Sequence, residues 1–191
     1  MAWAQPTNGW SPLPQSFSAD DLFASGRYEA ELTTGVMFSP VGNPLNRPEI
    51  NYTTTGLQLG WMPGGVHGRG PLRGSLELLG EVFGNAIYEG PGSYIAGAAV
   101  RVRYNFVPRG WRLIPYVEGA AGVVSTDIDR GLVGQPFNFD LEAAIGARYF
   151  IAPCWSVNLE YRFQHISNAD LGKRNVGVNA QGAVLGISYF F

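Results

Sequence analysis

The sequence predicts an all-β fold, namely an eight-stranded antiparallel transmembrane up-and-down β-barrel. Apolar and polar residues alternate in short segments, most regularly from residue 155 to residue 164, and successive side chains of a strand point to opposite faces of a sheet. Hydrophobic residues make up 46% of the chain, yet no run approaches the roughly 18 consecutive apolar residues of a membrane-spanning helix. Tight turns mostly alternate with longer loops, which is typical of outer-membrane barrels. A soluble β-sandwich can have a similar composition, so alternation and connections carry the prediction.

Residues 1–26 are expected to form an irregular periplasmic segment ahead of the barrel, which takes up residues 27–191. The start of the chain, Ala2-x-Ala4, is similar to the end of a signal-peptidase site, so we expect the signal peptide to have been removed already. Three prolines between residues 5 and 26 argue against a long regular element there. Residues 18–23 can form one helical turn.

Eight strands follow, and each places apolar side chains on one face and polar or charged side chains on the other. The predicted ranges are residues 27–39, about 51–62, about 72–88, 94–106, 111 to about 125, 137–151, a seventh strand that starts at residue 155, and about 178–191. In the third strand, for example, Leu76 and Val82 lie opposite Glu77 and Glu81. Aromatic residues near the strand ends are expected to form girdles at the membrane interfaces. They are Tyr88, Tyr94, Tyr104, Trp111, Tyr149 and Trp155.

The sheet is expected to close on itself, because a strand in lipid cannot leave its backbone hydrogen-bonding groups unpaired. Eight strands enclose a space that side chains can fill, so no water channel is expected. The inward faces carry charges of both signs, and buried charges need partners. We therefore predict an interior ion-pair network among Glu77, Glu81, Glu118, Glu142, Glu160, Arg101, Arg103, Arg148 and Arg162.

Charge and cysteine content exclude several classes of protein. The formal net charge of −2 argues against a nucleic-acid partner, which usually needs a basic patch. A single cysteine, Cys154, rules out an internal disulfide and lacks partners for a cysteine-based metal site. We expect no metal and no other cofactor. The chain ends in an aromatic residue, Phe191, which resembles the sorting signal of bacterial outer-membrane barrels.

The strongest chemical signal is a histidine and a serine at the end of the seventh strand. His165 and Ser167 are two residues apart, so they share a strand face, which the alternation predicts to be the outer one. Asn179 is expected beside them on the eighth strand. A serine hydroxyl becomes a nucleophile when a base takes its proton, and the base needs an orienting group. From spacing alone, His165 can equally be an interfacial polar residue and Ser167 a loop cap.

The motif His165-Ile166-Ser167-Asn168-Ala169, followed by Asn175-x-Gly177-x-Asn179, resembles the lipid A 3-O-deacylase family of the PagL type. These proteins are eight-stranded outer-membrane barrels that hydrolyse the acyl ester at position 3 of lipid A. The resemblance implies that Ser167 is the nucleophile and His165 the general base. It places Asn175 at an oxyanion position, where a backbone amide near Asp170 can also donate, and Asn168 lies in the same loop.

The sequence departs from the family pattern at the third triad position, where Glu is best known and Asn179 stands here. An amide can accept a hydrogen bond from the imidazole, but it cannot stabilise the imidazolium with a full charge. Lower activity, a contribution from Asp170 or a degenerate inactive barrel are the open outcomes. Lys173 and Arg174 in the last loop are expected to meet lipid A phosphates, or else form a solvated loop tip.

The leading hypothesis is thus an esterase of the bacterial outer membrane that acts on lipid A, the membrane anchor of lipopolysaccharide. Ser167 would form an acyl-enzyme, and water would then release the fatty acid. A structural or adhesive barrel that binds through its loops is the non-enzymatic alternative, and an acyltransferase acting on the same lipid is another. Homodimer formation is left open by the sequence.

Overall fold

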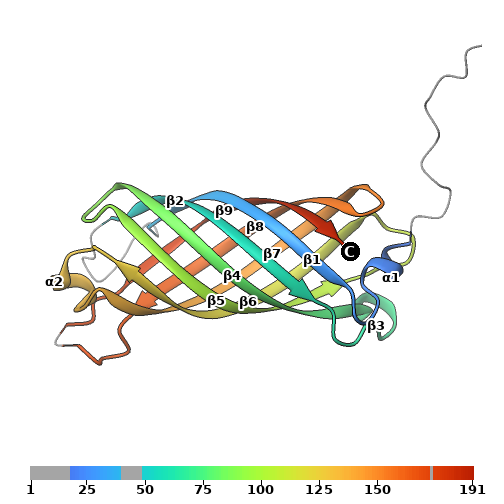
Figure 1. The fold of residues 1–191 in the computed structure, drawn as a ribbon, viewed down its shortest axis with the longest axis horizontal. Helices are drawn as coiled ribbons and strands as arrows, with labels where there is room; N and C mark the ends of the chain where they lie inside the picture. Colours follow the sequence, from blue (N-terminus) through green and yellow to red (C-terminus); the bar gives the residue numbers. More distant parts are fainter. Residues whose placement is uncertain (1–17, 40–48, 173) are drawn as a thin grey trace, which may run out of the picture.

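The protein is an eight-stranded antiparallel barrel, as predicted (Figure 1). The computed structural model describes residues 18–39, 49–172 and 174–191. The expected signal-peptide remnant and most of the N-terminal segment lie outside the described residues. The long strands are β1 (Tyr28–Phe38), β2 (Asn51–Trp61), β4 (Gly74–Glu89), β5 (Tyr94–Phe106), β6 (Leu113–Thr126), β7 (Phe137–Ala152), β8 (Trp155–Ser167) and β9 (Val178–Phe190).

The sheet closes because its first and last long strands pair. The strand order runs β2-β1-β9-β8-β7-β6-β5-β4, and β2 also pairs with β4. Each long strand therefore has a hydrogen-bonded neighbour on both sides, which satisfies its backbone groups without water. The remaining elements are short: α1 (Ala19–Leu22), β3 (Val66–His67), the 3₁₀ helix η1 (Gly70–Leu72) and α2 (Arg130–Val133). Figure 1 shows α1 and β3 at one end of the barrel, the α1 end, and α2 at the other, the α2 end.

The small strand β3 was not predicted. It lies in the glycine-rich connection between β2 and β4, and it pairs with the start of β4 through Val66↔Ser75. Gly65 has a φ of 71°, a left-handed conformation that glycine adopts at low cost. The chain can therefore bend here and pair again with β4 in the same antiparallel direction as β2, where the sequence indicated only a loop.

The outer wall of the barrel is apolar. Outward-facing Leu59, Val100 and Ile145 are 60%, 66% and 62% exposed, and such a surface would be costly in water. Most of the predicted girdle residues are exposed, whereas Tyr104 is half-buried and donates a hydrogen bond to the Leu72 carbonyl at 2.7 Å. Within the described residues, no helix is both long and apolar enough to cross a membrane.

The middle of the barrel interior holds the predicted ion-pair network. Arg101 pairs with Glu118 at 2.6 Å, with Glu142 at 2.5 Å and with Glu81. Further pairs link Arg103 with Glu31 and Glu118, Arg148 with Glu29, and Arg162 with Glu160. Isolated buried ions would each cost several kcal/mol, so the mutual pairing is what allows so many charges inside a closed sheet.

An apolar cluster lies on each side of the charged layer. At the α1 end, the predicted helical turn is present as α1, and Phe23 packs edge-on against Phe150 and Phe190, with ring centroids 6.1 and 5.6 Å apart. Arg73 pairs with Asp20 at 2.5 Å and ties α1 to the start of β4. At the α2 end, the second cluster includes side chains of β6, β8 and β9. This cluster packs against the inner face of β8 and β9 at their α2 ends.

Candidate active site

His165 and Ser167 lie on the outer face of β8 near the α2 end, as predicted. Both are partly exposed, whereas Ile166 between them and Asn168 after them are buried. The alternation continues the outward series of Tyr161 and Phe163 on the same strand. The apolar cluster holds Ile166 inside the barrel, and the period of two then directs the histidine and the serine outward.

Asn179 contacts His165 from the neighbouring strand. The two residues are paired in the β8–β9 ladder, and Nδ1 of His165 lies 2.6 Å from Oδ1 of Asn179. An amide oxygen only accepts, so Nδ1 carries the proton and donates it to this bond. In the neutral imidazole, Nε2 is then the basic nitrogen. The arrangement selects the tautomer that a general base for a serine hydroxyl requires.

Gly177 brings the backbone of the last loop close to both side chains. Its φ is 70°. A Cβ at this position would lie 3.5 Å from Cε1 of His165, 3.7 Å from Cβ of Ser167 and 2.9 Å from the Ile166 carbonyl oxygen. Glycine therefore satisfies two requirements here, a left-handed backbone and a close approach to the site.

The loop of residues 168–177, which we call the site loop, begins with a strained turn. Ala169 and Asp170 have φ values of 52° and 61°, which non-glycine residues seldom adopt. The Leu171 N–H donates to the Asn168 carbonyl at 3.0 Å and closes the turn, and two positive φ values in its centre are those of a type I′ turn. Such conformations cost about 1–2 kcal/mol per residue, so neighbouring contacts must hold them.

Asn175 supplies two of these contacts. Its Oδ1 accepts from the Asn168 backbone N–H at 3.0 Å, and its Nδ2 donates to Oδ1 of Asp170 at 3.0 Å. One amide thus clamps both ends of the strained segment. Asp170 is exposed, and its carboxylate is engaged with this amide.

A second loop, residues 127–136 with α2, holds the site loop from the side. Nδ2 of Asn168 donates to the Val133 carbonyl at 3.0 Å and to the Arg174 carbonyl at 2.7 Å, so both of its N–H groups are used. The Leu132 carbonyl accepts from the Val176 and Gly177 N–H groups at 2.9 and 3.1 Å.

Sequence reasoning missed the support from α2. The one local signal was Asp129, which caps α2 by accepting from the Gly131 N–H at 2.5 Å. The cap indicates a helical turn in this loop, but it does not indicate what the turn contacts.

Of the two cations predicted in the last loop, the structure describes Arg174. Arg174 is exposed, and its Nη1 lies 3.8 Å from where a Cβ of residue 131 would be, so its guanidinium sits beside α2. Lys173 lies outside the described residues. Among the residues that are described, no group of three or more His, Cys, Asp or Glu side chains is arranged to hold a metal ion.

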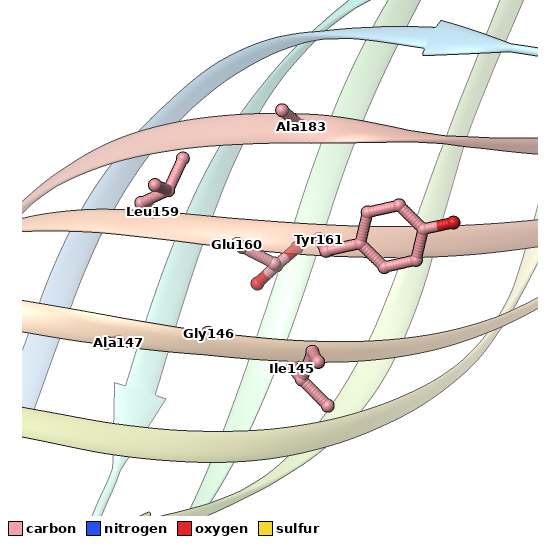
Figure 2. A pocket seen from close by; sticks show the side chains of 7 residues that line it. All are labelled: Ile145, Gly146, Ala147, Leu159, Glu160, Tyr161 and Ala183. Atoms are coloured by element: carbon pink, nitrogen blue, oxygen red, sulfur yellow. The ribbon is translucent and has the colours of Figure 1, made fainter.

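An apolar groove runs along the outer wall between the site and the α1 end. It is lined by Ile145, Gly146, Ala147, Leu159, Glu160, Tyr161 and Ala183 (Figure 2). The small side chains Ala147 and Ala183 leave room between Leu159 and Tyr161, and the groove therefore lies on the strands that carry His165 and Asn179.

Comparisons with known proteins place this geometry in context. The family model described as "Lipid A 3-O-deacylase (PagL)" matches residues 51–188. No curated protein matched the sequence.

Three solved structures share the fold. The outer membrane enzyme PagL has 18% identity and a TM-score of 0.57, over 83% of this chain and 97% of that one. Neisserial surface protein A has 16% identity and a TM-score of 0.60, over 87% and 98%. The N-terminal β-barrel domain of Pseudomonas aeruginosa OprF has 14% identity and a TM-score of 0.55, over 87% and 98%. At these identities the structures establish the fold, and an enzyme and a surface protein share it.

Proposed function

The chain belongs to the lipid A 3-O-deacylase (PagL) family of outer-membrane β-barrels, and we propose that it hydrolyses the acyl chain ester-linked at position 3 of lipid A by a serine–histidine mechanism. The observation that carries the proposal is the 2.6 Å contact between Nδ1 of His165 and Oδ1 of Asn179, on the lipid-facing wall beside Ser167. A purely structural barrel has no need of an oriented base next to a hydroxyl in that place.

The location of the site suits an ester at headgroup depth. At the α2 end, residues 39–50, 127–136 and 168–177 separate consecutive long strands, and only the turn 90–93 is short. At the α1 end, the turns 107–112 and 153–154 are tight, and the longer connection 62–73 holds β3 and η1. Outer-membrane barrels have short periplasmic turns and longer external loops, so we assign the α2 end to the cell exterior. The acyl chains of the substrate then stay in the outer leaflet, and only the ester reaches the catalytic groups.

The proposed chemistry starts from the tautomer that the His165–Asn179 contact selects. Ser167 Oγ attacks the ester carbonyl as Nε2 of His165 takes its proton. The tetrahedral intermediate collapses, and His165 returns the proton to the departing sugar hydroxyl, which leaves the fatty acid bound to Ser167. Water, activated by the same histidine, then hydrolyses this acyl-enzyme.

The oxyanion is assigned to the site loop. Asn175 uses one N–H of its amide on Asp170, and its second N–H is a donor suited to the developing charge, together with a backbone amide near Asp170. Both N–H groups of Asn168 are bound to carbonyls, so we propose that Asn168 shapes the loop. We further propose that Arg174, with Lys173, pairs with the phosphates of lipid A.

Asn179 takes the place of the acidic residue best known in this family. Its oxygen orients the imidazole in the same way as a carboxylate, as in Cys-His-Asn proteases. It provides no full charge for the imidazolium, so we propose a working but slower enzyme.

Mass spectrometry of lipid A tests the proposal against its alternatives. Lipopolysaccharide incubated with the purified protein should lose one ester-linked acyl chain and release a free fatty acid, and Ser167→Ala should abolish both. Ser125→Ala is a matched control, because Ser125 is also exposed at the α2 end of a strand, on β6. Unaltered lipid A with folded wild-type protein would support a structural or adhesive barrel, and a gain of one acyl chain would support an acyltransferase.

A further inference from the structure

Two short turns at the α1 end repeat one arrangement, in which an arginine and a glycine precede an exposed apolar residue. Residues 69–72, which include η1, read Arg-Gly-Pro-Leu, and residues 109–111 read Arg-Gly-Trp. We call them the arginine turns. Gly70 and Gly110 have φ values of 61° and 74°, which glycine adopts at low cost. Each turn can therefore be tight, so that its arginine and its apolar residue leave the same rim of the barrel.

The arginine turns are neighbours at the ends of β4, β5 and β6. The Val107 N–H donates to the Arg73 carbonyl at 2.9 Å, and Nη1 of Arg73 donates to the Val107 carbonyl at 2.5 Å. Arg73 directly follows the first turn, and Val107 lies two residues before the second. These reciprocal hydrogen bonds hold the two turns side by side at the end of the barrel where Figure 1 shows α1 and β3.

The apolar residue of each turn lies on the outer, lipid-facing side. Leu72 and Trp111 are 69% and 54% exposed. The hydroxyl of Tyr104, an outward-facing residue of β5, donates to the Leu72 carbonyl at 2.7 Å and so holds Leu72 at the outer wall. Trp111 precedes the outward-facing Leu113 of β6 by two residues. Exposed apolar and aromatic residues at the rim of a barrel are typical of the membrane interface.

The arginines of the two turns are exposed cations at an end of the barrel with few carboxylates. Outside the barrel interior, five arginines and two aspartates belong to the α1 end, namely Arg27, Arg69, Arg73, Arg109 and Arg112 with Asp20 and Asp21. Asp20 is paired with Arg73 at 2.5 Å. Within the part of the chain that the structure describes, Arg69 and Arg109 are exposed and form no ion pair. Two guanidinium groups are thus available for an anion beside two apolar residues.

We propose that the arginine turns bind the phosphate of an anionic phospholipid in the periplasmic leaflet, with Leu72 and Trp111 in contact with its acyl chains. With the α2 end outside the cell, the α1 end meets this leaflet. A guanidinium matches phosphate oxygens with paired hydrogen bonds and is only weakly hydrated. A phospholipid offers both features that the turns address, a phosphate at headgroup depth and acyl chains along the outer wall. Arg69 and Arg109 favour an anionic headgroup, because they repel the ammonium group of phosphatidylethanolamine.

Native mass spectrometry tests the site with two lipids of identical acyl chains, phosphatidylglycerol and phosphatidylethanolamine, mixed in equal amounts in the nanodiscs that hold the protein. An arginine close to the headgroups is worth roughly a fivefold preference for an anionic lipid. Wild type should therefore retain phosphatidylglycerol about 5- to 25-fold more than phosphatidylethanolamine. Arg69→Gln and Arg109→Gln should each lower this ratio several-fold, and the double variant should bring it close to one.

Arg130→Gln is the matched control, because Arg130 is an exposed arginine at the α2 end and its loss changes the net charge by the same amount. It should keep the wild-type ratio. Ser167→Ala should keep it too, since the measurement needs no hydrolysis, and the result is therefore independent of the proposed esterase. Equal retention of the two lipids by wild type would overturn the site. An equal loss of preference in Arg130→Gln and Arg69→Gln would also overturn it, because the attraction would then come from net charge alone.

Discussion

Replacing Asn179 with aspartate would add a charge to the site while keeping its geometry. Aspartate and asparagine have the same shape, so Oδ1 of residue 179 can stay 2.6 Å from Nδ1 of His165. Glutamate is one methylene longer and would have to fold back to reach the same nitrogen. Asn179→Asp therefore isolates the electrostatic contribution of the proposed third catalytic group.

The gain can be estimated from the strength of the hydrogen bond. A neutral bond contributes about 0.5–1.5 kcal/mol and a bond to a charged group about 1.5–3 kcal/mol. The carboxylate bond strengthens further as the imidazole becomes positively charged in the transition state, so a difference of about 1–1.5 kcal/mol favours the variant. At about 1.4 kcal/mol per factor of ten, kcat should rise roughly 5- to 12-fold. Asn179→Leu removes the acceptor and the control of the tautomer, and should lose tenfold or more.

Fatty acid release from lipid A in detergent micelles, followed across pH, measures both effects. A carboxylate beside His165 favours the protonated base, so the acidic limb of the Asn179→Asp rate profile should move to higher pH, a change that a merely structural role would not cause. The double variant Ser167→Ala/Asn179→Asp should be inactive and serves as the blank. An aspartate variant that is folded but no faster than wild type, or a leucine variant with full activity, would refute the assigned role of residue 179.

Three further predictions concern the scaffold. Gly177→Ala should lower kcat at least tenfold, because the new Cβ enters a left-handed backbone beside the site and strains it by about 1–2 kcal/mol; an unchanged kcat would contradict this. Arg101→Met should lower the free energy of unfolding of the barrel by about 3–5 kcal/mol, because it leaves three buried glutamates short of a partner. Urea unfolding from lipid vesicles measures this loss, and an unchanged free energy of unfolding would count against an essential network. Hydrogen bonds from Ser93 and Tyr94 lower the pKa of Asp127 from 3.8 to about 2, so the stability that this carboxylate contributes is present above pH 3.8 and is lost as the pH falls toward about 2. Relative to the intrinsic rates, the Ser93 and Tyr94 amides of the wild type should exchange slowly at pH 4 and faster as the pH falls toward 2. In Asp127→Asn they should be less protected at pH 4, and their protection should not change over this range; equal protection in the two proteins at pH 4 would show that Asp127 does not hold these loops.

The alternation of apolar and polar residues along the chain was sufficient to predict the barrel and part of the candidate site. The period of two separates Glu81 and Arg101 from the lipid-facing residues, and a closed sheet follows from the need to pair every strand in lipid. The same period places His165 and Ser167 on one face. The pairing of His165 with Asn179 needed one more assumption, that β8 and β9 are hairpin neighbours, and the structure confirms it.

Contacts made through the backbone could not be predicted. The Leu132 and Val133 carbonyls hold the site loop. Because every residue has a backbone carbonyl, residue type does not predict this role. The left-handed turn at Ala169 and Asp170 could not be predicted either, because alanine seldom adopts that conformation and a single aspartate is a weak signal for it. The hydrogen bond from the Tyr161 hydroxyl to Oε1 of Gln181 is diagonal across two strands, and it depends on a register that the length of the intervening loop does not determine.

The pairing of β9 with both β8 and β1 has a consequence for how the proposed esterase matures. The histidine lies on the penultimate strand and its amide partner on the final one. The final strand also closes the cylinder, because it pairs with the first strand. Contacts so distant in sequence form slowly. Hydrolytic competence should therefore arise only in the last step of assembly, when the polypeptide is complete and inserted, so that unfinished copies cannot attack the lipids that surround them.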